Sequence, residues 1–335
     1  MASPGLGYKS YFQFGRESTW NTAATVNKRL PMLPGAQPRA EHGRIISPAL
    51  DGKMNPVNIY VGGKRSRLTV EFELTYTGFL LMLDGMMGTA TYGSNGGSTS
   101  GVNPYTHTFR QKEFLNSYTL ELGMGDIPTG KVERILGAKI AEASFRCTGS
   151  LDSQDAIVTA RLTFVGGTYA ANVSATGSLS AATPDPVIYA HCSTDTDGSG
   201  DSSSDVELLG FELTIRNKLR DGFILDSTGS GVTNEPIRSG KTEITLQLTQ
   251  EFRTKTALDS FWLTYAAAAP SLVFTSGSKT ITFTLPSAFL TTHPEHDPAS
   301  DEIMVQTLNW RGLDDGSNNS ALTVIVVNAQ SSITA

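Results

Sequence analysis

Residues 64–88 read KRSRLTVEFELTYTGFLLMLDGMMG, and this stretch decides the fold of the chain. Its first part alternates between apolar and polar residues, a pattern typical of a β-strand with one face on a core and one face in water. The apolar positions are Leu68, Val70, Phe72, Leu74 and Tyr76. The spacing then becomes helical at Phe79, Met82, Leu83, Met86 and Met87, and Gly88 follows where a helix can end. We therefore predict a strand followed by a short amphipathic helix.

A second copy of this pattern occupies residues 241–265, KTEITLQLTQEFRTKTALDSFWLTY. Ile244, Leu246 and Leu248 alternate with polar residues, and 176 residues separate Leu68 from Ile244. A helical pattern follows at Leu258, Phe261, Trp262 and Tyr265, with Thr256 as its N-cap. Later segments match at an offset of about 165: 105–109 with 271–274, 118–122 with 281–285, 139–145 with 304–310, and 157–165 with 322–327. An element order that is kept in this way predicts a duplicated module.

Length and composition agree with this prediction. A chain of 335 residues can form two domains with their own cores. Only 17% of the residues are charged and 33 are glycine, which is typical of an all-β protein. The net charge of −6 argues against a basic surface that grips nucleic acid. No apolar run reaches about 18 residues and no signal peptide is recognised, so we expect no membrane span.

We predict a mainly β fold with two tandem β-sandwich or barrel modules, each with one short α-helix, and an extended N-terminal arm. The expected segments are an arm at 1–45, a first module at 46–170, a Ser/Gly/Asp-rich linker at 171–206 and a second module at 207–335. The arm carries Tyr11, Phe12, Phe14 and Trp20 without a periodic pattern. Such an arm must bury its aromatic residues on the body of its own chain or on a neighbour.

Two loops contain residues that could bind a metal ion. Asp195-Thr-Asp-Gly-Ser-Gly-Asp201 places alternate aspartates around glycines, as calcium loops do, but the twelfth position is Ser204 and no helices flank it. His293, His296 and Asp297 could hold a transition metal, although a proline lies between the two histidines. A solvated loop explains both better, so we expect no metal and no cofactor.

Neither catalysis nor disulfide bonding is expected from this sequence. No nucleophile elbow, phosphate-binding loop or dinucleotide fingerprint is present, so we predict no catalytic residues and no enzyme activity. Cys147 and Cys192 define no disulfide framework and are expected to be reduced thiols.

Short blocks along the chain carry a resemblance to a known family. In order they are GRESTWNTAAT (15–25), FLLMLDGMMG (79–88), YTHTF (105–109), NSYTLELGMGD (116–126) and ERILGAKIAEASFRCTGSL (133–151), followed by FELTIRNKL (211–219), SGKTEITLQLTQEF (239–252) and ITFTLPSAF (281–289). The chain resembles the major tail tube proteins of tailed bacteriophages, in the class with two tube-type modules per chain.

That resemblance implies a structural protein of the virion tail whose rings stack into a hollow tube, through which DNA passes during ejection. It also implies assembly in the bacterial host cytoplasm, and as partners other copies of the chain and the tail terminator, tape measure and baseplate proteins of the same phage. Whether the tail contracts stays open. The alternative is a two-domain β-sandwich that decorates a virion or acts as an adhesin, which does not explain a helix at the same place in each half.

In a tube, the polar faces of the two repeated strands are expected to line the bore, where DNA slides past without specific binding. These bore-facing residues are Thr69, Glu71, Glu73 and Thr75 from the first copy and Glu243, Thr245, Gln247 and Thr249 from the second, with Thr119 and Glu121 as weaker candidates. Tyr11, Phe12, Phe14 and Trp20 are expected to contact neighbouring subunits, as are loops 92–101 and 221–236.

The duplication also predicts the number of chains in a ring. Tube modules of the resembled family are arranged six around the axis, so two modules per chain imply three chains with approximate six-fold symmetry. The competing arrangement has six chains, with one module of each in the tube and the other projecting as decoration.

Overall fold

A computed structural model of the chain describes residues 7–46, 55, 59–94, 105–123, 130–148, 156–177, 179, 185–195, 208–220, 222, 233–251, 262–293, 305–316 and 320–333. The elements of the first half are η1 (Gly7–Lys9), β1 (Tyr11–Arg16), β2 (Lys28–Leu30), β3 (Gln37–Ile46), β4 (Ile59–Glu73), α1 (Leu80–Met87), β5 (Gly88–Ser94), β6 (Tyr105–Gln111), β7 (Tyr118–Gly123), β8 (Lys131–Thr148), β9 (Thr159–Gly166) and β10 (Tyr169–Ser174). Those that follow are η2 (Tyr189–His191), β11 (Cys192–Asp195), β12 (Leu208–Arg216), β13 (Leu219–Arg220), β14 (Ile237–Arg238), β15 (Glu243–Glu251), β16 (Ser271–Ser276), β17 (Lys279–Thr284), β18 (Ala288–Leu290), β19 (Val305–Gly312) and β20 (Thr323–Asn328).

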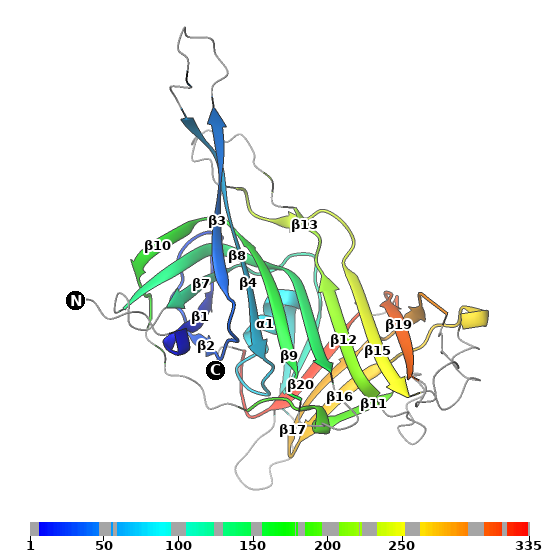
Figure 1. The fold of residues 1–335 in the computed structure, drawn as a ribbon. Helices are drawn as coiled ribbons and strands as arrows, with labels where there is room; N and C mark the ends of the chain where they lie inside the picture. Colours follow the sequence, from blue (N-terminus) through cyan, green and yellow to red (C-terminus); the bar gives the residue numbers. More distant parts are fainter. Residues whose placement is uncertain are drawn as a thin grey trace.

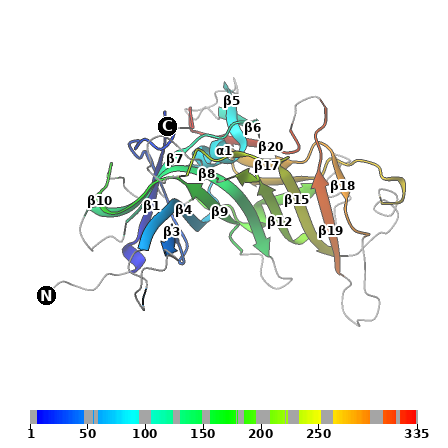
Figure 2. The same cartoon turned by 90° about the horizontal axis from the view of Figure 1, so that it is seen from above.

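Apart from β13 and β14, which pair only with each other, the described strands form two large antiparallel sheets, and both of these contain strands from both halves of the chain (Figure 1). A twelve-stranded sheet runs through β3, β4, β9, β8, β12, β15, β19 and β18, with β7, β1, β2 and β10 joined at β8. A six-stranded sheet has the order β11-β16-β17-β20-β6-β5. Figure 2 shows the two sheets as two layers, with α1 beside the six-stranded one. One hydrophobic core spans both halves.

The two strands that begin the repeat are confirmed. β4 buries Leu68, Val70 and Phe72, and β15 buries the apolar residues at its alternate positions in the same way. α1 begins at Leu80, and Gly88 adopts the left-handed φ of 106° as its C-cap. The amphipathic character expected of this helix is wrong, because all eight of its residues are buried. The second predicted helix lies mostly outside the described residues, and only 262–264 of it are seen as helical.

The later matches between the halves are wrong. β19 pairs with β15 as β9 pairs with β4, so residues 305–310 hold the place of β9 and not that of β8. β18 then pairs with β19 as β8 pairs with β9. The hairpin β5–β6 follows the first repeated strand, and the hairpin β16–β17 follows the second. The second strand of each hairpin is therefore equivalent, so β6 corresponds to β17 and not to β16. β20 lies in the six-stranded sheet, between β17 and β6. Short alternating segments resemble one another too closely for sequence order to decide which strands pair.

The N-terminal arm belongs to the body of its own chain. β1 pairs with β7 on one side and β2 on the other. Phe12 and Phe14 are fully buried in the common core, and the ring centroids of Phe12 and Phe72 lie 5.2 Å apart. Trp20 donates its indole N–H to the Gly137 carbonyl. The expected inter-subunit role of Phe12 and Phe14 is therefore wrong, since their side chains have no surface left for a neighbour. Tyr11 and Trp20 are partly exposed.

The segment expected as a linker is also bound into the body where the structure describes it. β10 pairs with β8, and β11 pairs with β16 in the six-stranded sheet. Between them, Val187 is fully buried, and its neighbours bridge to Thr75 and Ile157. The module boundaries stay predictions, but the two halves are joined by continuous backbone hydrogen bonding.

Candidate functional site

The polar face of the twelve-stranded sheet brings the two predicted rows of bore-facing residues together. Starting from Glu71 in β4, directly opposed residues lead across β9, β8 and β12 to Thr245 in β15. The intervening positions are Arg161, Ser144 and Thr214. Side chains on one face of a sheet share a register row, so β4 and β15 present their polar residues on the same side. This polar face, defined here by β3, β4, β9, β8, β12, β15 and β19, is the candidate site.

Most of the predicted residues lie on this polar face. Gln247 is exposed, and the half-exposed ones are Thr69, Glu71, Glu73, Glu243, Thr245 and Thr249. Thr75 is an exception: β4 has ended at Glu73, and Thr75 is buried with its hydroxyl donating to the Thr77 carbonyl at 2.5 Å. The expectation that Thr75 faces an open bore is therefore wrong.

Thr119 and Glu121 in β7 are fully buried, which also corrects their assignment. Thr119 donates to Glu17 Oε1 at 3.0 Å. Glu121 accepts hydrogen bonds from Gln13 Nε2 and from the guanidinium of Arg134, both at 2.8 Å. Alternation identified the polar face of β7 correctly, but the arm and its neighbours cover that face and supply partners for the polar groups.

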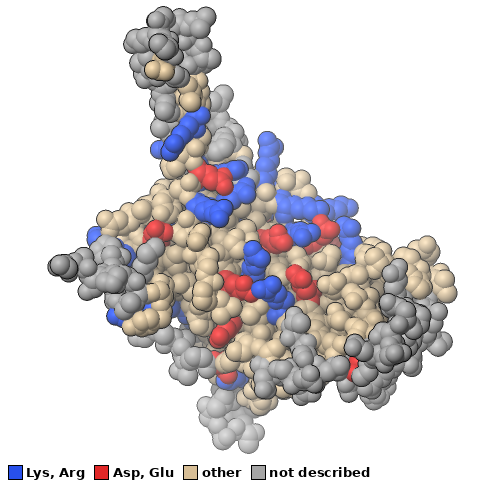
Figure 3. Space-filling view, viewed as in Figure 1, with Lys and Arg blue, Asp and Glu red and all other residues tan. Residues whose placement is uncertain are grey.

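Ion pairs between strands neutralise much of the polar face. Arg146 on β8 lies 2.6 Å from Glu71, and Arg216 on β12 lies 3.4 Å from Glu142. Glu243 lies between Lys218, at 3.2 Å, and Arg311, at 4.0 Å. The hydrogen bond from Lys218 and its charge lower the pKa of Glu243. Figure 3 shows blue and red side chains interspersed over this face.

The sequence does not predict these cations beside the glutamates. The arginines stand on β8, β9, β12 and β19 and not on the two repeated strands, so only the sheet topology places them there. The alternation of Glu212, Thr214 and Arg216 was the one signal in the sequence that mixed charge would occur on this face.

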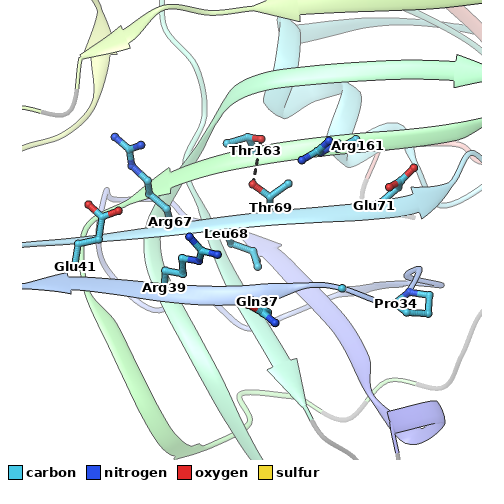
Figure 4. A pocket seen from close by; sticks show the side chains of 11 residues that line it. Pro34, Gln37, Arg39, Glu41, Arg67, Leu68, Thr69, Glu71, Arg161 and Thr163 are labelled. Carbon is cyan, nitrogen blue, oxygen red and sulfur yellow. Dashed lines mark hydrogen bonds between the residues drawn. The ribbon is translucent and has the colours of Figure 1, made fainter.

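A hollow of about 600 Å³ lies on the polar face where β3, β4 and β9 meet (Figure 4). Arg39, Arg67 and Arg161 line it together with Glu41 and Glu71. Arg39 and Arg67 are directly opposed on neighbouring strands, a like-charge arrangement that weakens strand pairing. Both carboxylates already have partners, since Glu41 pairs with Arg65 and Glu71 with Arg146. Three arginine side chains therefore gather at the β3 edge of the polar face.

A long hairpin of β3 and β4 projects from the body (Figure 1). Near its end Ile45, Ile46 and Tyr60 are more than half exposed, at 58%, 55% and 54%. Large apolar side chains on a projecting element in water are typical of a contact surface. Residues 43–63 lack clear alternation, so the sequence alone does not predict a long regular hairpin here.

The two loops that were weighed as metal sites, and for which no metal is expected, fall largely outside the described residues. Of the calcium-type loop only Asp195 is described, at the end of β11, and of the histidine loop only His293, beside the ring of Trp262. Within the described ranges, no three His, Cys, Asp or Glu side chains gather as metal ligands. Neither Cys147 nor Cys192 forms a disulfide bond, and burial raises the pKa of the Cys147 thiol to about 11. None of the described helices has the length and apolar character needed to cross a membrane.

Comparison with known proteins assigns the family. A family model described as phage tail tube protein matches residues 7–312, nearly the whole chain. The chain belongs to the phage tail tube protein family. No curated protein matches it. Tail tube proteins are structural components of the virion tail that assemble into tubes, and the mainly β architecture of this chain agrees with that class.

Proposed function

We propose that this tail tube protein assembles as rings of three chains, which stack into a hollow tube with the polar face as its lining. The observation that supports the proposal is the single register row from Glu71 to Thr245, which runs through strands of both halves of the chain in one sheet. A wall of this kind is what a bore needs, since its outer face packs on the core and its inner face stays wet.

The strand directions allow such a wall to close. The path from β3 to β18 contains eight strands, β3-β4-β9-β8-β12-β15-β19-β18, and each neighbouring pair is antiparallel. With an even number of alternating strands, β3 and β18 run in opposite directions. The β3 of a second copy can therefore join β18 of the first in an antiparallel pair, and a barrel closed in this way has no free edge.

The number of three chains per ring is supported by the equivalent strands that the two halves contribute to the polar face. β4 and β9 in the first half have the same relation as β15 and β19 in the second. If one half were a decoration on a six-chain ring, only the other would contribute such strands to the face. Covalent linkage also makes half of the module contacts intramolecular, which lowers the entropy lost on assembly.

A neutralised lining suits the passage of DNA. Arginine and lysine bind phosphates by releasing counterions, which would hold DNA in place. On this face Arg146, Arg216 and Arg311 already lie beside glutamates, so most of the bore presents paired charges and hydroxyls. DNA then slides past without specific binding, and no catalytic step is involved.

Contacts between rings are assigned to the β3–β4 hairpin in place of the N-terminal arm. The hairpin projects from the body and carries exposed Ile45, Ile46 and Tyr60. At the ends of the tube the same surfaces meet the terminator and baseplate proteins, and the bore holds the tape measure protein during assembly in the host cytoplasm.

Electron microscopy of the purified protein tests the proposal. We expect long hollow tubes whose cross-section shows three chains per ring and Glu71 and Glu73 on the inner surface. Monodisperse globular particles under all assembly conditions would favour the decoration or adhesin alternative. Six chains per ring, or Glu71 on the outer surface, would contradict the arrangement even if tubes form.

A further inference from the structure

The junction between β8 and β12 joins the two halves inside one chain. Its register places Thr214 opposite Ser144 and Arg216 opposite Glu142. The charges across it are complementary, with Arg216 Nε 3.4 Å from Glu142 Oε1. At each end of the long sheet, by contrast, the described residues show a strand with a partner on one side for most of its length: β3 at one end and β18 at the other. A ring requires these two ends to meet.

Position within the repeat relates β3 to β12. Thr69 in β4 is equivalent to Thr245 in β15, by the same offset of 176 that separates Leu68 from Ile244. Gln37 is opposite Thr69, and Thr214 is opposite Thr245. Gln37 therefore holds the place of Thr214. Two residues further along, Arg39 holds the place of Arg216, since their partners Arg67 and Glu243 are also 176 residues apart.

The same reasoning relates β18 to β8. Glu142 is opposite Thr163 in β9, and Phe289 is opposite Arg311 in β19. Thr163 and Arg311 are in turn the partners of the equivalent residues Thr69 and Thr245. Phe289 therefore holds the place of Glu142.

Two residues further along the same strands, Thr291 holds the place of Ser144. The Thr291 N–H donates to the Asn309 carbonyl at 2.8 Å, so Thr291 continues the β18–β19 register and lies opposite Asn309. In the first half, Ser144 is opposite Arg161. Arg161 is opposite Glu71, and Asn309 is opposite Gln247. Because Glu71 and Gln247 are equivalent positions of the repeat, 176 residues apart, Arg161 and Asn309 are equivalent too.

We infer that β18 of one copy pairs with β3 of the next in the register of the internal junction. Thr291 then lies opposite Gln37 of the neighbouring copy, and Phe289 lies opposite Arg39. This inference rests on the proposed ring and adds the residue pairs that close it. The pairs are chemically compatible, because a threonine hydroxyl bonds to a glutamine amide and a guanidinium stacks on a phenyl ring.

The structure also limits how far this pairing extends. At the internal junction, Asn217 donates its N–H to the Ala141 carbonyl at 2.9 Å. The equivalent of Ala141 is Ala288, whose N–H and carbonyl both bond to Ala268 at 2.8 Å. The ladder between copies therefore ends before Ala40, at the part of β3 that continues into the projecting hairpin (Figure 1).

Pro38 shortens the ladder further and makes it selective. Pro38 occupies the position in β3 that Ile215 occupies in β12. The backbone N–H of Asn217 points toward β8, and backbone groups two residues apart in a strand point the same way, so those of Ile215 also point toward β8. Proline can accept but not donate at this position. Proline on an edge strand protects against unspecific extension of a sheet, so this edge accepts few partners in few registers.

Disulfide trapping tests the register. In the chain with Cys192→Ser, the double variant Gln37→Cys/Thr291→Cys is assembled into tubes and mildly oxidised. Residues at a non-hydrogen-bonded antiparallel position lie about 4.5 Å apart between Cα atoms, within disulfide range. We expect covalent species that reach three chains and no more. The matched control Gln37→Cys/Phe289→Cys, displaced by two residues, should cross-link several-fold less.

Each outcome bears on the inference. Tubes without cross-links in the Gln37→Cys/Thr291→Cys variant, or equal cross-linking in the displaced control, overturn the register while the tube function stands. Failure of the unmodified protein to form tubes counts against the proposed function instead. If the double variant does not assemble, chains with a single Gln37→Cys or Thr291→Cys are mixed with an excess of unmodified chain. A two-chain band that needs both single variants supports the register, and its absence overturns it.

Discussion

Arg146 reaches past strand β9 to place its Nη2 2.6 Å from Oε1 of Glu71, although the two residues stand on strands that are not neighbours. This ion pair ties β4 to β8 on the polar face. Half of the Arg146 side chain and a quarter of that of Glu71 are exposed, so water screens the pair.

Glu71→Gln should therefore lower the free energy of unfolding by at most about 1 kcal/mol, and 1 M salt should remove the difference. Urea unfolding of the monomer measures it, with Glu73→Gln as control, because Glu73 forms no ion pair within the described ranges. A loss above about 2 kcal/mol would mean that the pair is far less screened than its exposure indicates.

Phe12→Ala should destabilise the monomer by about 3–5 kcal/mol, because a fully buried phenyl ring leaves a cavity between Phe14 and Phe72. For the same reason, deletion of residues 1–40 should prevent folding, since it removes β1 and β2 from the sheet. Denaturant titration followed by circular dichroism measures both. Tyr8→Ala, at a position that is 81% exposed, is the matched control. A folded deletion variant that merely fails to polymerise would restore the inter-subunit role of the arm.

Asp84 should make stability depend on pH. It is buried in α1, where its Oδ2 accepts hydrogen bonds from the Tyr118 hydroxyl at 2.9 Å and from Asn116 Nδ2 at 2.8 Å. Burial is the largest influence and raises the pKa of this carboxyl in the folded state. The folded protein therefore holds the proton more tightly than the unfolded chain does. The stability contributed by protonated Asp84 is present below the unfolded pKa and is lost as pH rises through the folded pKa.

Asp84→Asn should flatten this pH dependence and raise the melting temperature at pH 8, because asparagine can still accept both hydrogen bonds. Thermal unfolding between pH 4 and pH 8 measures the effect. The control is Asp314→Asn in an exposed turn, where the side-chain acceptor for the Gly316 N–H is kept. An unchanged pH profile in Asp84→Asn would show that other groups control stability in this range.

The free energy of unfolding should depend on the contact between buried Lys139 and Glu235. The Lys139 side chain is almost fully buried, and its ammonium lies 2.7 Å from Glu235 and 3.0 Å from the Pro236 carbonyl. Glu235→Gln leaves a buried charge with weaker partners and should cost about 1–3 kcal/mol. Lys139→Met/Glu235→Gln should regain most of that loss, because no buried charge is left. A double-mutant cycle in urea measures the coupling, and additive losses would show that the pair is not coupled.

Ile45→Ser/Ile46→Ser should leave the monomer folded but raise the protein concentration needed to form tubes. Both side chains are more than half exposed on the projecting hairpin, so their removal does not affect the core. Sedimentation and electron microscopy measure assembly. Ile237→Ser, an exposed apolar site on the body, is the control. Normal tube length and yield in the double variant would remove the hairpin from the contacts between rings.

The sequence by itself determined the local structure of the repeated stretch. Period-two alternation fixed the buried face of β4 and β15, because successive side chains of a strand point to opposite sides. The change to helical spacing and the glycine at position 88 fixed α1 and its end. The ordered blocks were also sufficient to identify the family, since they follow from element order and not from contacts.

Only the tertiary structure decided what covers each element. Alternation shows that one face of β7 is polar, but not that Gln13 and Glu17 would cover it with hydrogen-bond partners. It could not show that Phe12 packs in its own chain, because the partner Phe72 lies sixty residues away and non-local contacts leave no periodic signal. The pairing of β8 with β12 joins the two halves in one sheet. It is likewise set by long-range backbone hydrogen bonds, and the sequence pattern does not say which strand forms them because other alternating strands could pair equally well.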